Sequence, residues 1–206
     1  MKLPKRYLKQ EEQLKTLIGE AIDLWVNIEF SIIRIFAMAL HIEDEDLARI
    51  IQHVNTFRIL LQMTDSAVRN RFKTPGLRKH WLSILEYVRE LSGDRNYIVH
   101  AGIMMDEYKT KAGHDHIKPT IGPSNLVILG VEQNHEPIDI REIKELISDF
   151  KQANRFLLDL EVEWENVWDK SLSEGKQPSF REKFLRPISR RRPPRKIRLE
   201  ASRKEQ

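Results

Sequence analysis

The chain has 206 residues, of which 40% are apolar and 32% are charged, and it contains eight Gly and no Cys. This length suits one domain with a sizeable core plus a tail, and the composition is typical of a helix-rich globular protein. The lack of Cys excludes disulfides and thiolate metal sites. The longest apolar stretch, residues 30–42, contains Arg34 and is too short to span a bilayer, and the N-terminal residues lack the apolar run of a signal peptide. We therefore expect a cytoplasmic protein without a membrane segment.

Charge is distributed unevenly along the chain. Of the 35 basic and 31 acidic residues, 12 and 4 fall in residues 171–206, so residues 1–170 hold 23 basic and 27 acidic groups. The last segment also contains several prolines and few apolar residues, which predicts a disordered basic tail. The expected organisation is a helical domain over residues 1–170 followed by this tail.

The first predicted helix is long, because apolar residues recur at alternating steps of four and three. This spacing places them on one face of a helix that packs against others. The predicted buried positions are Leu14, Ile18, Ala21, Trp25, Ile28, Ile32, Ile35 and Ala39.

Two further helical segments follow. One is predicted over residues 44–72, with a break near Asn55 and a buried stripe at Leu47, Ile50, Ile51, Val54, Leu61 and Val68. The next begins at Thr74 and Pro75, a capping residue followed by proline at the first helical position. It continues through Leu77, Trp81, Leu85 and Val88 to Ala101, with a kink or a restart expected near Gly93 and Asp94.

Helical periodicity disappears between about residues 103 and 136, where Gly and Pro punctuate the chain. The runs IMMDEYKT, HIKPTI and NLVILGV are candidates for strands of a small hairpin. Helix resumes at Asp139, where Asp139 and Glu142 form a capping-box pattern and Ile138 with Ile143 forms a hydrophobic staple. The predicted stripe of this helix is Ile143, Leu146, Phe150, Leu157, Leu160, Trp164 and Val167. The predicted fold is therefore all-α, a bundle of about four helices with a small irregular or β-hairpin insertion.

A polar cluster stands at the end of the third helical segment, in the stretch SGDRNYIVHAGI. It places Arg95, Asn96 and His100 within two turns of a helix otherwise built for burial. Polar groups removed from water cost free energy unless each finds a partner, so these residues need a reason to be there.

The motif RNYIVH, at the end of a long helix in an all-α protein, resembles the signature of the HEPN superfamily. That signature is an Arg followed by four to six residues and a His, commonly with Asn after the Arg. The resemblance covers residues 8–168 through the motif and the helical layout. It implies a helical bundle that forms a homodimer, in which the motifs of two subunits face one cleft and active members cleave RNA without a metal.

The positions that match the signature are Arg95, Asn96 and His100, which the resemblance implies are the catalytic residues. It further implies a toxin or defence component with a cognate antitoxin as a partner. One subgroup of toxins paired with a nucleotidyltransferase antitoxin carries Tyr two residues after the His. Here that position is Gly102, which argues against modification of this kind.

The chemistry of the motif also follows from its residue types. Metal-independent RNA cleavage uses the ribose 2′-hydroxyl as nucleophile, and it needs a proton acceptor near neutral pH and a cation on the phosphate. His and Arg meet these two needs. On a straight helix Asn96 and His100 lie about 40° apart, whereas Arg95 lies about 140° from His100. A helix kink at Gly93, a long Arg bending round, or a second subunit would bring the groups together.

Two other interpretations of the motif stay open. It could serve a non-catalytic nucleic-acid or nucleotide-binding or protein-interaction module, or the Arg and His could simply bond helix-end carbonyls and a nearby carboxylate. Glu29 is the candidate carboxylate, because it interrupts the apolar stretch between Ile28 and Ile32. It is either a supporting residue of the motif or a surface carboxylate.

The basic tail is interpreted as an arm for nucleic acid or another anionic surface, with a solvated tail that aids solubility as the alternative. The candidate RNA-binding residues in it are Arg190, Arg191, Arg192, Arg195, Lys196 and Arg198.

Other patterns are weaker. His114 and His116 flank Asp115, a cluster that can bind a metal but is more typical of a solvated loop. The four tryptophans fall on the helical stripes and are interpreted as core rather than as base-stacking platforms; they are Trp25, Trp81, Trp164 and Trp168. The common nucleotide-binding, serine-hydrolase and zincin motifs are missing, so neither a metal nor a cofactor is predicted.

Overall fold

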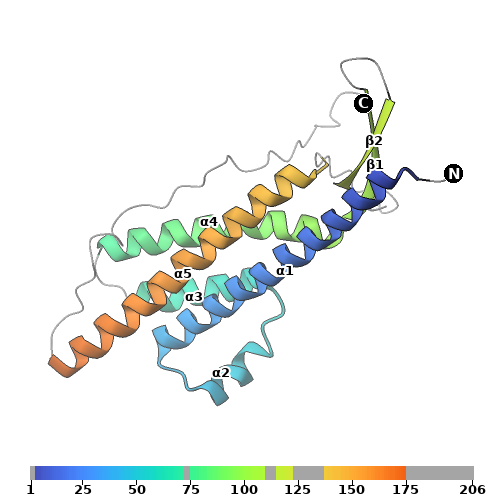
Figure 1. Cartoon of the computed structure of the whole chain (residues 1–206). Helices are drawn as coiled ribbons and strands as arrows, with labels where there is room; N and C mark the ends of the chain where they lie inside the picture. Colours follow the sequence, from blue (N-terminus) through green and yellow to red (C-terminus); the bar gives the residue numbers. More distant parts are fainter. Residues whose placement is uncertain (1–2, 72–74, 110–114, 123–136, 175–206) are drawn as a thin grey trace, which may run out of the picture. The chain divides into compact units, whose positions relative to one another are not determined.

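The computed structural model describes residues 3–71, 75–109, 115–122 and 137–174. Within these residues the chain is mostly helical, as predicted, with one small antiparallel sheet (Figure 1). The elements in chain order are α1 (Lys5–Leu40), α2 (Asp44–Ile51), α3 (Phe57–Arg71), α4 (Pro75–His100), β1 (Gly102–Lys109), β2 (Asp115–Gly122) and α5 (Ile140–Glu174).

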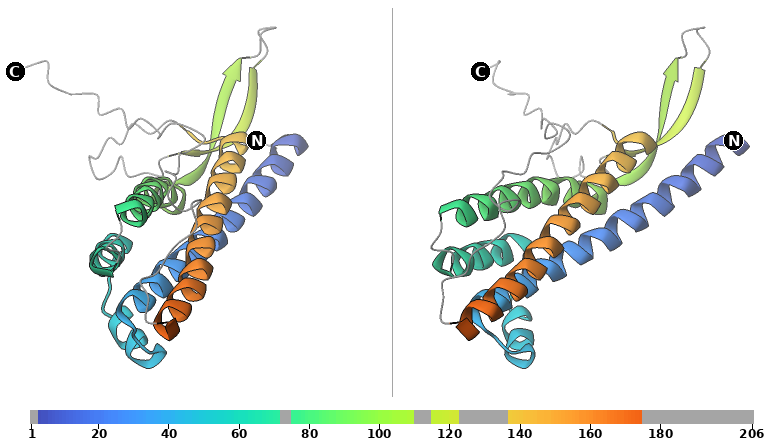
Figure 2. Two further views of the ribbon diagram at one scale, coloured as in Figure 1. Left: turned by 90° about the vertical axis from the view of Figure 1, so that its left-hand side faces the viewer. Right: turned by 60° about the vertical axis from the view of Figure 1, so that its left-hand side comes forward.

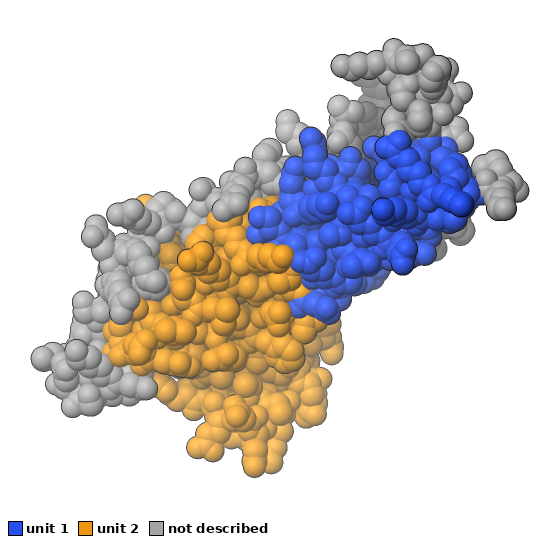
Figure 3. Space-filling model, in the orientation of Figure 1, with its two compact units in different colours: residues 1–23, 93–148, 193–206 blue, residues 24–92, 149–192 orange. Residues whose placement is uncertain are grey.

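The chain divides into two compact units (Figure 3). Unit 1 comprises residues 1–23, 93–148 and 193–206, and unit 2 comprises residues 24–92 and 149–192. Unit 1 contains the RNYIVH motif and the hairpin. Unit 2 contains α2, α3, the second half of α1 and the larger parts of α4 and α5.

Helix α1 confirms the periodicity of the sequence almost completely. Seven of the eight predicted positions are buried; Ile18, the exception, is half-buried. Stacking these side chains at steps of three and four along 36 residues gives the helix one continuous apolar face. This face supplies a large share of the core.

The break predicted near Asn55 is confirmed, since α2 ends at Ile51 and α3 begins at Phe57. The predicted burial of the first half of this segment is wrong, because no residue of α2 is buried and Leu47, Ile50 and Ile51 are only half-buried. Periodicity identifies the apolar face of a helix but not how fully neighbouring elements cover it. In α3, by contrast, Leu61 and Val68 are buried as predicted.

Helix α4 begins at Pro75, where the missing backbone N–H of proline costs nothing because the first turn has no acceptor for it. Thr74, its predicted cap, lies outside the described residues. The helix then continues without interruption to His100, so the predicted restart near Gly93 is wrong. Gly93 is tolerated inside the helix at a cost of about 1 kcal/mol relative to Ala.

Two strands form a hairpin directly after α4, confirming the first two predicted strand runs (Figure 2). The antiparallel register runs from Gly102 opposite Gly122 to Lys109 opposite Asp115. Backbone hydrogen bonds of 2.8 Å in both directions join Ile121 to Ile138, so the segment before α5 continues the sheet. The third run, NLVILGV, lies outside the described residues.

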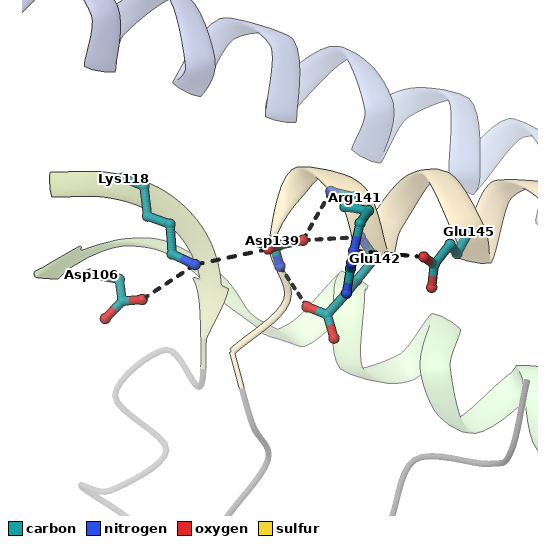
Figure 4. Close-up of polar contacts among 6 residues, drawn as sticks. All are labelled: Asp106, Lys118, Asp139, Arg141, Glu142 and Glu145. Carbon is teal, nitrogen blue, oxygen red and sulfur yellow. Dashed lines mark hydrogen bonds and ion pairs between the residues drawn. The ribbon is translucent and has the colours of Figure 1, made fainter. Parts of the chain in front are cut away.

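The start of α5 is a capping box, as predicted (Figure 4). Asp139 Oδ1 accepts hydrogen bonds from the backbone N–H groups of Arg141 and Glu142 at 2.9 and 3.0 Å, and Glu142 Oε2 accepts one from the N–H of Asp139 at 2.9 Å. Lys118 Nζ lies 3.8 Å from the carboxylates of both Asp139 and Asp106. The cap therefore also ties the start of α5 to the hairpin.

Replacing Asp139 by Ala should lower the free energy of unfolding by about 1 kcal/mol, because two backbone donors lose their acceptor. Asp139→Asn is the matched control, since it keeps a capping oxygen and removes only the charge that faces Lys118. Chemical denaturation of the two variants measures the difference. Equal stability of Asp139→Ala and the unmodified protein would contradict this account of the helix start.

Aromatic side chains from three helices meet in the core of unit 2. The ring of Trp25 lies 4.8 Å from that of Phe57 and 5.5 Å from that of Phe150, both in tilted or edge-on geometry. The amide of Asn154 donates to the backbone carbonyl of Leu24 at 2.9 Å, which holds α5 against α1. Six of the seven predicted positions of α5 are buried, and Val167 is half-buried.

Glu161 is an exception to this apolar packing, because it is 1% exposed and lies against α1. Its Oε2 lies 3.2 Å from Nε of Arg34, whose guanidinium also lies 3.7 Å from Glu165. Burial raises the pKa of the Glu161 carboxyl and outweighs the opposing effects of Ser31 and Arg34. The ionised carboxylate is therefore held at a cost in free energy.

A raised pKa means that Glu161 contributes stability below its unfolded-state pKa and loses that contribution as pH rises through its folded-state pKa. Glu161→Gln, which does not ionise, should therefore gain melting temperature relative to the unmodified protein as the pH is raised from acid to neutral. Thermal unfolding across this pH range measures the gain. Glu165→Gln, which removes the same charge from a 56% exposed side chain, is the control and should show a much smaller trend. If the difference in melting temperature between Glu161→Gln and the unmodified protein does not vary with pH, the raised pKa of Glu161 is refuted.

Helix α5 continues to Glu174, four residues beyond the expected domain end at residue 170. The remaining tail lies outside the described residues. None of the helices in the described part of the chain combines the length and the apolar character needed to cross a membrane.

Candidate functional site

The RNYIVH motif forms the last turns of α4, within unit 1. Leu91, Asp94 and Ile98 face the interior, being 0%, 7% and 4% exposed. Asn96 and His100, on the opposite side of the helix, are both exposed, and Arg95 on the flank is half-buried. The amide and the imidazole are therefore presented to solvent one turn apart on one helix face.

Arg95 bends toward this exposed face. Its Nη1 donates a hydrogen bond to Oδ1 of Asn96 at 3.1 Å, although the two Cα positions differ by about 100° around the helix. Helix α4 continues through Gly93 without interruption, so this contact is made by the length of the Arg95 side chain within one helix. The structure thus brings Arg95 and Asn96 together, with His100 on the face of Asn96.

Tyr97 anchors the motif to the hairpin. Its hydroxyl donates to the backbone carbonyl of Ile121 at 3.3 Å, and this carbonyl also accepts the N–H of Ile138 at 2.8 Å. The backbone N–H of Ala101 bonds to the carbonyl of Tyr97 at 2.9 Å, which closes the last turn. The helix end that carries His100 is therefore fixed to β2 and to the segment before α5.

Asp94 was not singled out by sequence reasoning, yet it is a buried carboxylate immediately before Arg95. The available signal was its position four residues before Ile98, which puts both on the apolar stripe of α4. A carboxylate on a buried stripe requires polar partners. Asp94 is thus a further polar residue at the helix end, on its buried side.

Glu29 lies in unit 2, where Oε1 accepts the indole N–H of Trp25 at 2.6 Å. This is an i to i+4 contact along α1, and Glu29 is half-buried. One of its oxygens therefore satisfies the polar edge of a core tryptophan. A role of Glu29 beside the motif remains a prediction.

The remaining sequence predictions have different outcomes. Trp25, Trp81 and Trp164 are at most 2% exposed, which confirms that they belong to the core, and the indole N–H of Trp81 donates to Asp65 at 3.0 Å. The side chain of Trp168 lies outside the described residues, as do His114, the side chain of His116 and residues 175–206 of the basic tail. No group of three or more His, Asp or Glu side chains in the described part of the chain is arranged to hold a metal ion.

The chemical capacity of the motif follows from this arrangement. A guanidinium presents several N–H donors in a fork that suits phosphate oxygens, and its contact with Asn96 fixes the direction of that fork. Imidazole is the side chain used most often as general acid or base in catalysis. The two together suit the recognition of a phosphodiester and the transfer of a proton beside it.

The chain matches no known protein family, no curated protein and no solved structure.

Proposed function

We propose that the protein is a metal-independent endoribonuclease of the HEPN type. The observation that supports this most is the hydrogen bond from Arg95 to Asn96, with His100 one turn away on the same exposed face. A cation able to bind phosphate and a group able to transfer protons, both within the last two turns of α4, would suit this chemistry, and the residues are those of the superfamily signature. The protein acts in the cytoplasm as a toxin or defence component.

In the proposed reaction the ribose 2′-hydroxyl attacks the adjacent phosphate. The new bond joins the 2′-oxygen to phosphorus, the bond from phosphorus to the 5′-oxygen breaks, and the products are a 2′,3′-cyclic phosphate and a 5′-hydroxyl. His100 acts as general base or general acid in the two proton transfers. Arg95 binds the phosphate oxygens as negative charge accumulates, and Asn96 orients the guanidinium.

The proposed enzyme is a homodimer, as the resemblance implies, with the motifs of two subunits in one cleft. The two subunits would then supply the proton acceptor and the proton donor, one from each copy of His100. A cognate antitoxin is the proposed protein partner. Gly102 is the first residue of β1, at the position where the nucleotidyltransferase-paired subgroup has tyrosine, so the proposed control by the antitoxin is binding rather than modification of that residue.

Incubation of the purified protein with RNA in excess EDTA tests this function. We expect cleavage to continue without divalent metal, and an RNA with a 2′-deoxyribose at the cleaved position to resist, because the nucleophile is missing. Binding without cleavage of any RNA would instead support the non-catalytic module. Products with a 3′-hydroxyl would exclude the proposed chemistry.

The tail should add RNA affinity without chemistry. A chain that ends at Glu174, the last residue of α5, loses all 12 basic residues of the tail. It should bind RNA more weakly, with a shallower dependence on salt, because fewer phosphates are neutralised and fewer counterions released. Its fold and its cleavage rate at saturating RNA should stay the same.

Filter binding at several salt concentrations measures this difference. The control is a full-length chain in which Arg190, Arg191, Arg192, Arg195, Lys196 and Arg198 are replaced by Gln, which keeps the length and removes half of the positive charge. Its salt dependence should be intermediate. Equal affinity and equal salt dependence of the full-length and truncated chains would rule out the arm.

A further inference from the structure

The outer face of α5 in unit 2 carries a regular pattern of exposed residues. Lys151, Arg155, Leu158, Val162 and Glu165 follow one another at steps of four, three, four and three, and all five are exposed. Leu158 is 49% exposed and Val162 55%. Steps of four and three are those of the contact line between two packed helices. In the described residues the opposite side of the helix already forms the core, so this line faces outward.

Helix α1 widens this outward face. In unit 2 the two helices lie side by side in both views of Figure 2, and Arg34 of α1 lies 3.7 Å from Glu165. Phe30 precedes Arg34 by one turn on the same side of α1, and its ring is 60% exposed. Val26, a further turn back, is 39% exposed. Contiguous exposed apolar side chains of this kind mark interaction surfaces.

The charges on the α5 face identify the partner. The basic residue Arg155 lies five positions before residue 160, and the acidic residue Glu165 lies five positions after it. Leu158 and Val162 lie two positions before and after the same point. An antiparallel copy of α5, related by a two-fold axis at the level of residue 160, therefore sets Arg155 opposite Glu165 twice and Leu158 opposite Val162 twice.

A parallel alignment of the same faces gives the opposite result. It sets Arg155 against Arg155 and Glu165 against Glu165, so like charges meet on both sides of the apolar centre. The surface is thus complementary to itself only across a two-fold axis, which is the property of an isologous interface. An apolar centre between charged edges is also the usual composition of a protein interface.

We propose that this surface binds a second copy of the chain, with the two α5 helices antiparallel and crossing near residue 160. This inference rests on the outer face of α5 and its neighbour α1, and not on the proposed cleavage. It names a surface for self-association that the motif does not define.

Charge reversal tests the proposal by sedimentation. Arg155→Glu sets two acidic pairs across the axis and Glu165→Arg sets two basic pairs, so each variant should dimerise roughly tenfold or more weakly. The double variant Arg155→Glu/Glu165→Arg restores both opposite pairs and should dimerise like the unmodified chain. Arg49→Glu, an equal charge change on a 71% exposed side chain of α2, is the matched control and should have no effect.

The two single variants also make a sharper test when mixed. A chain with Glu at positions 155 and 165 pairs favourably with a chain that has Arg at both, so the mixture should form heterodimers although each variant alone associates poorly. Since the chain has no Cys, Leu158→Cys and Val162→Cys can report orientation. A mixture of these two chains should form a disulfide between unlike chains, as the antiparallel arrangement requires.

The possible results separate the proposal from its alternatives. A monomer at high micromolar concentration, or a dimer that Arg155→Glu and Glu165→Arg leave unchanged, would overturn it, and so would disulfides between like chains only. Cleavage of RNA is measured separately on the same variants. If the variants lose the dimer but still cleave RNA, the proposed cleft between the motifs of two subunits is contradicted, whereas the α5 interface is not. If the variants keep both the dimer and the cleavage, only the α5 interface is contradicted.

Discussion

His100→Ala should lower the rate of RNA cleavage by about 10²–10⁴-fold, because it removes the proposed proton-transfer group. Arg95→Ala should lower it by about 10²–10³-fold, since the phosphate loses its preorganised cation as negative charge develops. Asn96→Ala should have a smaller effect, because the guanidinium loses only the acceptor at 3.1 Å that orients it. Single-turnover cleavage in excess EDTA measures all three rates.

Matched controls separate the motif from general effects of substitution. His53→Ala removes an exposed imidazole from the segment between α2 and α3, and Arg89→Ala removes an exposed guanidinium from α4 two turns before the motif. Both should cleave RNA at the unmodified rate, and circular dichroism should show all variants folded. Undiminished cleavage by both His100→Ala and Arg95→Ala would eliminate the proposed mechanism.

Trp25→Ala should destabilise the protein by about 3–5 kcal/mol, which is a large part of a typical free energy of unfolding. The side chain is 1% exposed, its ring packs against Phe57 and Phe150, and its N–H satisfies Glu29. The variant therefore loses buried apolar contacts, leaves a cavity and removes the donor to a half-buried carboxylate. Urea denaturation measures the loss.

Two further variants identify its cause. Trp25→Phe keeps most of the apolar contacts and removes the hydrogen bond, so it should cost less than Trp25→Ala. Leu8→Ala, at a position of α1 that is 50% exposed, should change stability by only about 0.5 kcal/mol. A Trp25→Ala variant as stable as Leu8→Ala would mean that Trp25 is not part of the core.

The candidate site shows where sequence reasoning ends. The three residue types are read directly from the sequence, and the shared face of Asn96 and His100 follows from the helical repeat. The direction of Arg95 does not, because a long side chain has several rotamers and the hydrogen bond to Asn96 selects among them. The anchoring of Tyr97 to Ile121 required the hairpin to be in place, 24 residues later in the chain.

Local chemistry by itself determined most of the helical layout. The steps of three and four predicted the buried faces of α1 and α5, Pro75 marked the start of α4, and Asp139 with Glu142 marked the start of α5. These features depend on residues within a turn or two of one another, so the sequence contains all the information they need. The same holds for the short runs between Gly and Pro residues that became β1 and β2.

Only the tertiary structure decided how completely each face is covered. The apolar face of α2 is half-exposed, whereas Glu161, an acid beside the predicted stripe of α5, is buried against Arg34 of α1. One carboxylate oxygen of Glu29 accepts a hydrogen bond from Trp25. The line from Lys151 to Glu165 is known to be exposed only because the opposite face of α5 lies in the core. Burial depends on side chains brought together from distant parts of the chain, and the apolar periodicity of one helix does not specify which other elements pack against it.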